Sequence, residues 1–181
     1  MAISVFDLFT IGIGPSSSHT VGPMRAALMF TTRLQKNGLT DKVARLKVHL
    51  YGSLGATGRG HGTHKAVVLG LQGETPEGVD VDKIPARMQA VEDESRLTLH
   101  GGKTIPFIIK DDLVFENRVS LPSHPNGLKF LAFNEAGIEL LSRIYYSVGG
   151  GFVINESKTD EPVMAESAEE LPYPFDIGEQ L

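Results

Sequence analysis

The hydrophobic pattern of this chain changes part-way along its length, and this change constrains the fold more than any other feature. In the first half, apolar residues recur at helical spacing over residues 22–36, 63–71 and 82–93, and they alternate over residues 43–51. After Arg96 the apolar stretches are short and separated by turn residues, as is typical of strands; they cover residues 96–100, 105–110, 113–116, 128–134 and 138–148. Helices followed by a run of strands predict an α+β domain, with helices packed on a mixed or antiparallel sheet.

Charge is distributed unevenly between the body of the chain and its last residues. Residues 156–181 contain eight acids and one base, together with three prolines. Residues 1–155 contain 14 acids and 16 bases, so the body carries +2 while the whole chain carries −5. We therefore predict a domain over residues 1–155 and an acidic, proline-containing linker over residues 156–181.

Composition excludes several classes of protein and site. The chain has no cysteine, so it can form no disulfide, hold no thiolate-ligated zinc or iron–sulfur cluster, and use no cysteine nucleophile. No apolar run approaches the roughly 20 residues of a membrane helix, and the N-terminus lacks the basic start of a signal peptide. The net charge argues against a nucleic-acid-binding face. We expect a cytoplasmic protein that contacts neither membrane nor nucleic acid.

Glycines gather in residues 52–62, which hold five of the 20 glycines of the chain. This density predicts a loop, which serves either close backbone approach to a ligand or turn geometry alone. The spacing does not match a dinucleotide-binding fingerprint, and no Gly-Lys-Ser/Thr follows, so a P-loop is also excluded.

A second polar loop stands immediately before the first predicted helix. Its five consecutive side chains carry hydroxyl or imidazole groups: Ser16, Ser17, Ser18, His19 and Thr20. The N–H groups at a helix N-terminus receive carboxylate or phosphate, and a simple helix cap needs only one Ser or Thr. The loop therefore predicts ligand binding, with an N-cap as the simpler alternative.

His61 is the candidate general base. It lies between Gly60 and Gly62, which leave little steric cover over the ring, and imidazole titrates near neutral pH. A metal pair of His61 with His64 is an alternative, but the usual zinc helix spaces its histidines by four and places a glutamate between them. Lys65 offers a pyridoxal phosphate alternative, which no phosphate-cradling glycine loop supports, so we expect no such cofactor.

Two further clusters complete the pattern, Ser-His-Pro-Asn-Gly at residues 123–127 and Tyr-Tyr-Ser-Val-Gly-Gly-Gly at residues 145–151. Turn chemistry alone explains the first, and a strand end followed by a bulge is an alternative for the second. Taken in order, the segments at residues 12–25, 51–54, 57–63, 126–127, 145–152 and 172–175 resemble the β domain of bacterial iron–sulfur-dependent L-serine dehydratases. The resemblance covers almost the whole chain.

The resemblance implies a reaction and an architecture. L-Serine would lose water to give aminoacrylate, which hydrolyses to pyruvate and ammonia. Cysteines of a following, mainly helical α domain, in the same or a separate chain, would hold a 4Fe-4S cluster, and its Lewis-acidic iron would take the hydroxyl group. The β domain would supply the base and the substrate-binding loops and would be inactive alone. Its fold would resemble the allosteric substrate-binding domain of some D-3-phosphoglycerate dehydrogenases.

The resemblance also assigns residues. His61 would be the base, and residues 16–20 with Gly60, Gly62 and Thr63 would bind the substrate. The family usually has an aspartate after Gly-Thr, where this chain has His64, so we assign no role to that residue. Two other readings stay open: a regulatory module that senses serine, and a dimerisation module whose glycine loops shape an interface; we expect a homodimer.

Overall fold

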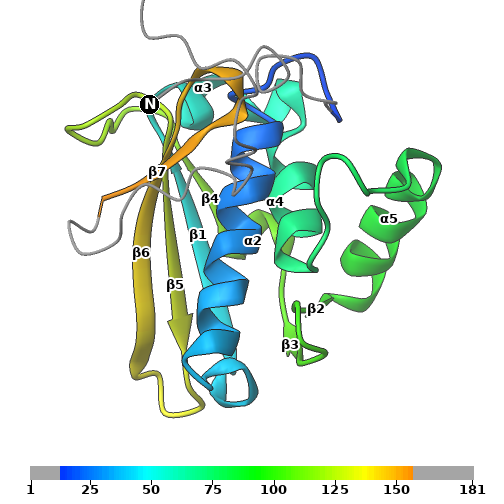
Figure 1. Ribbon diagram of the computed structural model, residues 1–181. Coiled ribbons are helices and arrows are strands. Elements are labelled where there is room, and N and C mark those ends of the chain that lie inside the picture. The colour runs from blue at the N-terminus through cyan, green and yellow to red at the C-terminus, as the bar shows by residue number, and fades with distance from the viewer. Residues whose placement is uncertain (1–12, 157–181) are drawn as a thin grey trace, which may run out of the picture.

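A five-stranded sheet organises the protein, and its helices pack on one face (Figure 1). The computed structural model describes residues 13–156. The strand order is β4-β1-β5-β6-β7: β1 (Arg45–Tyr51) pairs in parallel with β4 (Leu113–Glu116), and every other pairing is antiparallel. The other strands of this sheet are β5 (Gly127–Phe133), β6 (Glu139–Ser147) and β7 (Val153–Asn155). The predicted α+β class and mixed sheet are confirmed, whereas the predicted linker over residues 156–181 lies, except for its first residue, outside the described residues.

The helices form a layer in front of the sheet. In that layer α2 (Val21–Lys36) and α4 (Thr63–Leu71) lie side by side, and α5 (Ile84–Glu94) lies further out (Figure 1). All three helices begin and end within two residues of their predicted bounds. Smaller elements complete the described chain: α6 (Ile109–Asp112), the β2–β3 hairpin (Arg96–Thr98 and Thr104–Pro106), and the 3-10 turns η1 (Thr40–Lys42), η2 (Val81–Lys83) and η3 (Gly149–Gly151).

The core lies between α2, α4 and the inner face of the sheet. Alternate residues of β1, among them Leu46 and Val48, are fully buried, as the alternating sequence predicts. Phe30 of α2 stacks on Phe130 of β5 with ring centroids 5.2 Å apart, and Tyr145 of β6 meets the edge of that ring at 5.8 Å. Each such side chain stabilises the fold by about 1.5–3 kcal/mol through its burial, so these contacts hold α2 against this face of the sheet.

The glycine-rich segment is the main correction to the sequence prediction. Residues 52–61 form a helix, α3 (Gly52–His61), and Gly62 in the left-handed conformation joins it directly to α4. The glycines permit close packing: a side chain at Gly55 would place its Cβ 2.6 Å from the Glu116 carbonyl oxygen of β4. Tertiary contact with the sheet therefore overrides the low helix propensity of glycine.

A second correction concerns the predicted strand at residues 105–110. The strand β3 ends at Pro106, and the chain then turns into α6. The Asp112 carboxylate accepts a hydrogen bond from the Ile108 N–H at 2.9 Å, which closes this turn and ends the extended backbone. Among residues 13–156, no helix combines the length and the apolar character that crossing a membrane requires.

Candidate functional site

One face of α3 carries three polar side chains at helical spacing. Ser53, Thr57 and His61 follow one another every four residues, so they share one face. This face meets the loop that precedes α2, where the ring of His19 lies 4.8 Å from the ring of His61. The structure thus brings together the two regions from which the sequence predicted a site, residues 16–20 and His61. Ser53 and Thr57 were missed because their spacing carries meaning only once the glycine-rich segment is known to be helical.

His19 is the centre of the hydrogen-bond network. Only 9% of its surface is exposed, and its Nε2 lies 3.1 Å from both Ser53 Oγ and Thr57 Oγ1. On the other side of the ring, Nδ1 lies 3.1 Å from Ser18 Oγ and 3.4 Å from Ser16 Oγ. His19 therefore ties the serine loop to α3.

The direction of these hydrogen bonds follows from Thr57. Its hydroxyl donates its single hydrogen to the Ser53 carbonyl oxygen at 2.9 Å, so toward His19 it acts as an acceptor. Nε2 of His19 then carries the proton, and Nδ1 accepts from the Ser18 hydroxyl at 3.1 Å. Ser53 also accepts from Nε2, which leaves its own hydroxyl hydrogen available to a ligand.

Electrostatics keep His19 neutral. Burial lowers the pKa of His19 below its ordinary value, and the neighbouring His61 lowers it further, while an interaction with the backbone of Ser53 opposes the shift. A neutral His19 suits its role in the network because it donates at one ring nitrogen and accepts at the other. It also avoids placing a fixed positive charge beside His61.

His61 is held in one tautomer by its own helix. Its Nδ1 lies 3.0 Å from the Thr57 carbonyl oxygen, one turn earlier in α3. A carbonyl oxygen only accepts, so Nδ1 carries the hydrogen and the neutral ring presents the lone pair of Nε2. Because His61 is only half-buried, a small molecule can reach its ring. This is the arrangement that a general base requires.

The serine loop is folded by its own backbone. The Ser16 carbonyl oxygen accepts hydrogen bonds from the Thr20 N–H at 2.9 Å and from Thr20 Oγ1 at 2.6 Å. The Thr20 side chain makes no capping bond to α2, so the simple N-cap reading does not describe this loop. The N–H groups at the start of α2 are largely engaged: Gly22 donates to the Ser17 carbonyl oxygen, and Pro23 has none. The serine hydroxyls are therefore the main donors that the loop offers.

Buried hydrogen bonds fix the loop from behind. Thr63 is fully buried, and its hydroxyl donates to the His19 carbonyl oxygen at 2.6 Å. Ser147 of β6 donates to the Ser18 carbonyl oxygen at 2.7 Å, and Asn126 donates through Nδ2 to the Ser147 carbonyl oxygen at 3.1 Å. The clusters that the sequence singled out at residues 123–127 and 145–151 thus meet the serine loop and hold it against the sheet.

The remaining predicted residues have simpler surroundings. Gly60 is exposed near the end of α3, with nothing within 4 Å of the position of a Cβ. Gly62 forms the left-handed link between α3 and α4, with a φ of +79°. Within residues 13–156, no three His, Asp or Glu side chains gather as metal ligands would. His64 lines a separate hollow together with Arg59, Glu92 and Lys110.

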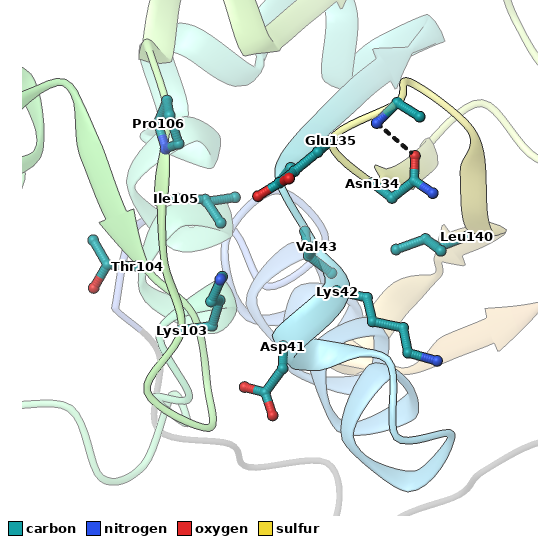
Figure 2. Close-up of a pocket in the computed structure, with 12 residues that line it drawn as sticks. Asp41, Lys42, Val43, Lys103, Thr104, Ile105, Pro106, Asn134, Glu135 and Leu140 are labelled. Atoms are coloured by element: carbon teal, nitrogen blue, oxygen red, sulfur yellow. Dashed lines mark hydrogen bonds between the residues drawn. The ribbon is translucent and has the colours of Figure 1, made fainter.

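The hollow drawn in Figure 2 lies at the other end of β1 from this cluster. It measures about 670 Å³ and is bordered by η1, β3 and the turn between β5 and β6. Its border mixes charges of both signs, such as Asp41, Lys42 and Lys103. Asn134 closes the turn by accepting from the Ala136 N–H at 3.0 Å (Figure 2). Because no histidine or serine lies on this border, we assign the candidate site to the His19–His61 cluster instead.

Comparison with known proteins identifies the family. The family model of the serine dehydratase beta chain matches residues 4–158. The chain belongs to this family. It is 52% identical over 181 residues to the L-serine dehydratase of Streptomyces coelicolor, covering 100% of the chain and 40% of that relative. It is 44% identical over 181 residues to L-serine dehydratase 1 of Escherichia coli, covering 99% of the chain and 39% of the relative. The Mycobacterium tuberculosis L-serine dehydratase is 44% identical over 173 residues, which cover 96% of the chain and 37% of the relative.

The chain spans about 40% of the length of these relatives. The resemblance inferred from the ordered motifs is thus confirmed at the level of the family. The roles of individual residues belong to the proposal that follows.

Proposed function

We propose that this beta chain supplies the proton-abstracting base and most of the substrate-holding hydroxyls of an L-serine dehydratase. In the reaction, a base removes the α-proton of L-serine while hydroxide leaves the β-carbon, giving aminoacrylate, which hydrolyses to pyruvate and ammonia. The names of the relatives support the reaction class. The observation that carries the assignment to these residues is the hydrogen bond from His61 Nδ1 to the Thr57 carbonyl oxygen.

His61 takes the α-proton at Nε2. The bond at Nδ1 holds the ring so that the unprotonated nitrogen faces away from the helix backbone. When Nε2 accepts the proton, the Thr57 carbonyl oxygen stabilises the resulting imidazolium through the Nδ1–H bond. The neutral state of His19, whose ring lies 4.8 Å away, avoids a second positive charge at that moment.

The substrate carboxylate binds to the serine hydroxyls of the cluster. Ser16 and Ser17 are half-buried at the surface of the loop, and Ser53 retains a hydroxyl hydrogen that no described residue uses. Ser18 is also half-buried, but its hydroxyl donates to Nδ1 of His19, so toward the substrate it acts as an acceptor. Hydroxyl donors arranged around an anion replace the water that a carboxylate loses on binding. Gly60 and Gly62, on either side of His61, leave open the approach to the ring.

His19, Thr20 and Thr63 position this constellation. His19 and Thr63 are buried, and their side chains form hydrogen bonds with other protein groups rather than with solvent. Thr20 is likewise bonded to Ser16. Although the sequence predicted all three as substrate-binding, we now assign them to holding the serine hydroxyls and His61 in register.

The hydroxide must leave with the help of a group outside this chain. A 4Fe-4S cluster requires thiolate ligands, and the chain has no cysteine, so its residues do not fit such a cluster. We propose that a separate α domain, in the same or another chain, holds the cluster and completes the site. The resemblance of the sequence motifs also leads us to propose that the protein is a cytoplasmic homodimer. We propose in addition that residues 1–155 form one domain, whose fold is related to the allosteric substrate-binding domain of D-3-phosphoglycerate dehydrogenase.

The test is a substitution in the complete enzyme, with the cluster-binding part present. His61→Asn removes the base while retaining a polar side chain, and we expect kcat to fall about 10²–10⁴-fold with the cluster absorbance unchanged. The matched control is His100→Asn, which changes a histidine in a turn away from the His19–His61 cluster. This variant should leave kcat unchanged. Intact kcat with altered cooperativity in His61→Asn would overturn the catalytic role and favour the serine-sensing reading.

The proposal also requires the beta chain to be inactive by itself. The purified 181-residue chain should release no pyruvate from L-serine, because the help with the departure of hydroxide comes, in this proposal, from the α domain. Turnover by this chain alone would contradict the division of labour between the two parts.

A further inference from the structure

A second polar hollow, of about 360 Å³, lies beyond the turn that joins α3 to α4. Its charged side chains and its one histidine come from four elements: Arg59 of α3, His64 of α4, Glu92 of α5 and Lys110 of α6. His61 is not among the residues that line it. The size is within the range of pockets that hold small molecules, so the hollow is a candidate binding site distinct from the His19–His61 cluster.

His64 has an unsatisfied polar atom at this place. Its Nδ1 is buried and has no hydrogen-bond partner among residues 13–156. Burial lowers the pKa of His64, and the charges of Lys65 and Arg59 lower it further while Glu92 opposes them. A buried imidazole nitrogen without a partner is unfavourable, and a ligand with a hydrogen-bonding group would satisfy it.

Positive charge exceeds negative charge around the hollow. The Arg59 guanidinium lies over the ring of Phe115, 4.7 Å from its centroid, and forms no ion pair with an acid of residues 13–156. Lys110 is exposed at the rim and likewise has no acid partner in that range. Glu92 is the single acid on the border, so two cations face one anion.

Apart from Ser95, the rest of the border is apolar. It is formed by Val91, Ile108, Ile109 and Phe115. A ligand that fits must therefore combine an anionic end with a short aliphatic part. Inorganic phosphate has no such part, and a long acyl chain exceeds the available volume.

We propose that this hollow binds a small monocarboxylate, whose carboxylate pairs with Arg59 and Lys110 and accepts a hydrogen bond from His64 Nδ1. Its aliphatic part packs against Val91 and Ile109. The guanidinium held flat on Phe115 keeps its N–H groups in one plane, which is the geometry that a carboxylate accepts.

The test uses sodium propionate, the full 181-residue chain and the side-chain nitrogen signals of its histidines by NMR. We expect a saturable shift of the His64 ring nitrogens at propionate concentrations up to about 50 mM. By calorimetry, His64→Phe and Arg59→Met should each weaken binding about tenfold or more, since each removes a hydrogen bond to a charged group. The control Lys65→Met removes a neighbouring charge that does not line the hollow, and it should change the affinity less than about twofold.

Three results would overturn the proposal. They are an absence of saturation, equal binding by all three variants, and equal affinity for inorganic phosphate. Shifts confined to His19 and His61 would also overturn it, while they would support anion binding at the proposed catalytic cluster. Because the measurement is of binding to this chain, it is independent of whether His61 is a catalytic base.

Discussion

Replacing Gly70 by alanine should destabilise the protein, although alanine is the better helix former. Gly70 lies in α4 on the side that packs against α2. A Cβ at Gly70 would lie 2.2 Å from the Met24 carbonyl oxygen and 2.9 Å from the Ala27 Cβ. Because the nearest atom belongs to the backbone, no rotation of a side chain can relieve the overlap, and the two helices must separate.

The magnitude follows from two opposing effects. Overpacking a tight interface costs about 1–3 kcal/mol, whereas the change from glycine to alanine inside a helix gains about 0.5–1 kcal/mol. The net loss of unfolding free energy should therefore reach up to about 2.5 kcal/mol. For a domain of this size that corresponds to a fall of up to about 10 °C in the melting temperature.

Gly60 supplies the matched control. It lies in α3 with no atom within 4 Å of the Cβ position, so Gly60→Ala should gain the helix-propensity term alone and stabilise by about 0.5–1 kcal/mol. Urea unfolding followed by circular dichroism measures both variants. If Gly70→Ala proved as stable as Gly60→Ala, the close approach of α2 and α4 would not exist as described.

Three further outcomes are expected. Thr63→Val, which keeps the side-chain shape, should cost about 1–3 kcal/mol in urea unfolding because it leaves the buried His19 carbonyl oxygen without its donor; an unchanged midpoint would refute that bond. Burial lowers the pKa of both His19 and His64 below 6.5, so the folded state binds fewer protons than the unfolded state. Their contribution to the free energy of unfolding should be fully present above pH 6.5 and should be lost as the pH falls through the pKa values of the folded state. A urea midpoint that rose on acidification would contradict this. Nitrogen-15 NMR at neutral pH should find His61 protonated at Nδ1, whereas a proton at Nε2 would remove the basis for its role as a base.

The sequence by itself determined the elements whose signals are local. The bounds of α2 and α4 follow from the spacing of their apolar residues, and those of β1 from the alternation of apolar and polar residues. This works because a helix or strand with one buried face has apolar residues at the period of that element. The ordered motifs also identified the family, because each retains its residues at its place along the chain. His61 and residues 16–20 could be selected as site residues since their chemistry is visible in their types.

Only the tertiary structure decided the state of the glycine-rich segment. Local propensity favours a loop at residues 52–62, but contact with β4 and β1 makes it a helix that lies close on the sheet. That helix gives Ser53 and Thr57 a shared face with His61 and sets the tautomer of the ring. It also places His61 and His64 in different surroundings, although the two residues are only three positions apart in the sequence.

The hydrogen bonds of the site join residues far apart in the chain. His19 reaches Ser53 and Thr57, and Ser147 reaches Ser18 across 129 positions. No pattern within a segment encodes such a pairing, because it depends on the distance between elements after they pack. The sequence therefore determined which groups are available for chemistry, and the packing of α2 and α3 at the end of β1 decided which of them meet.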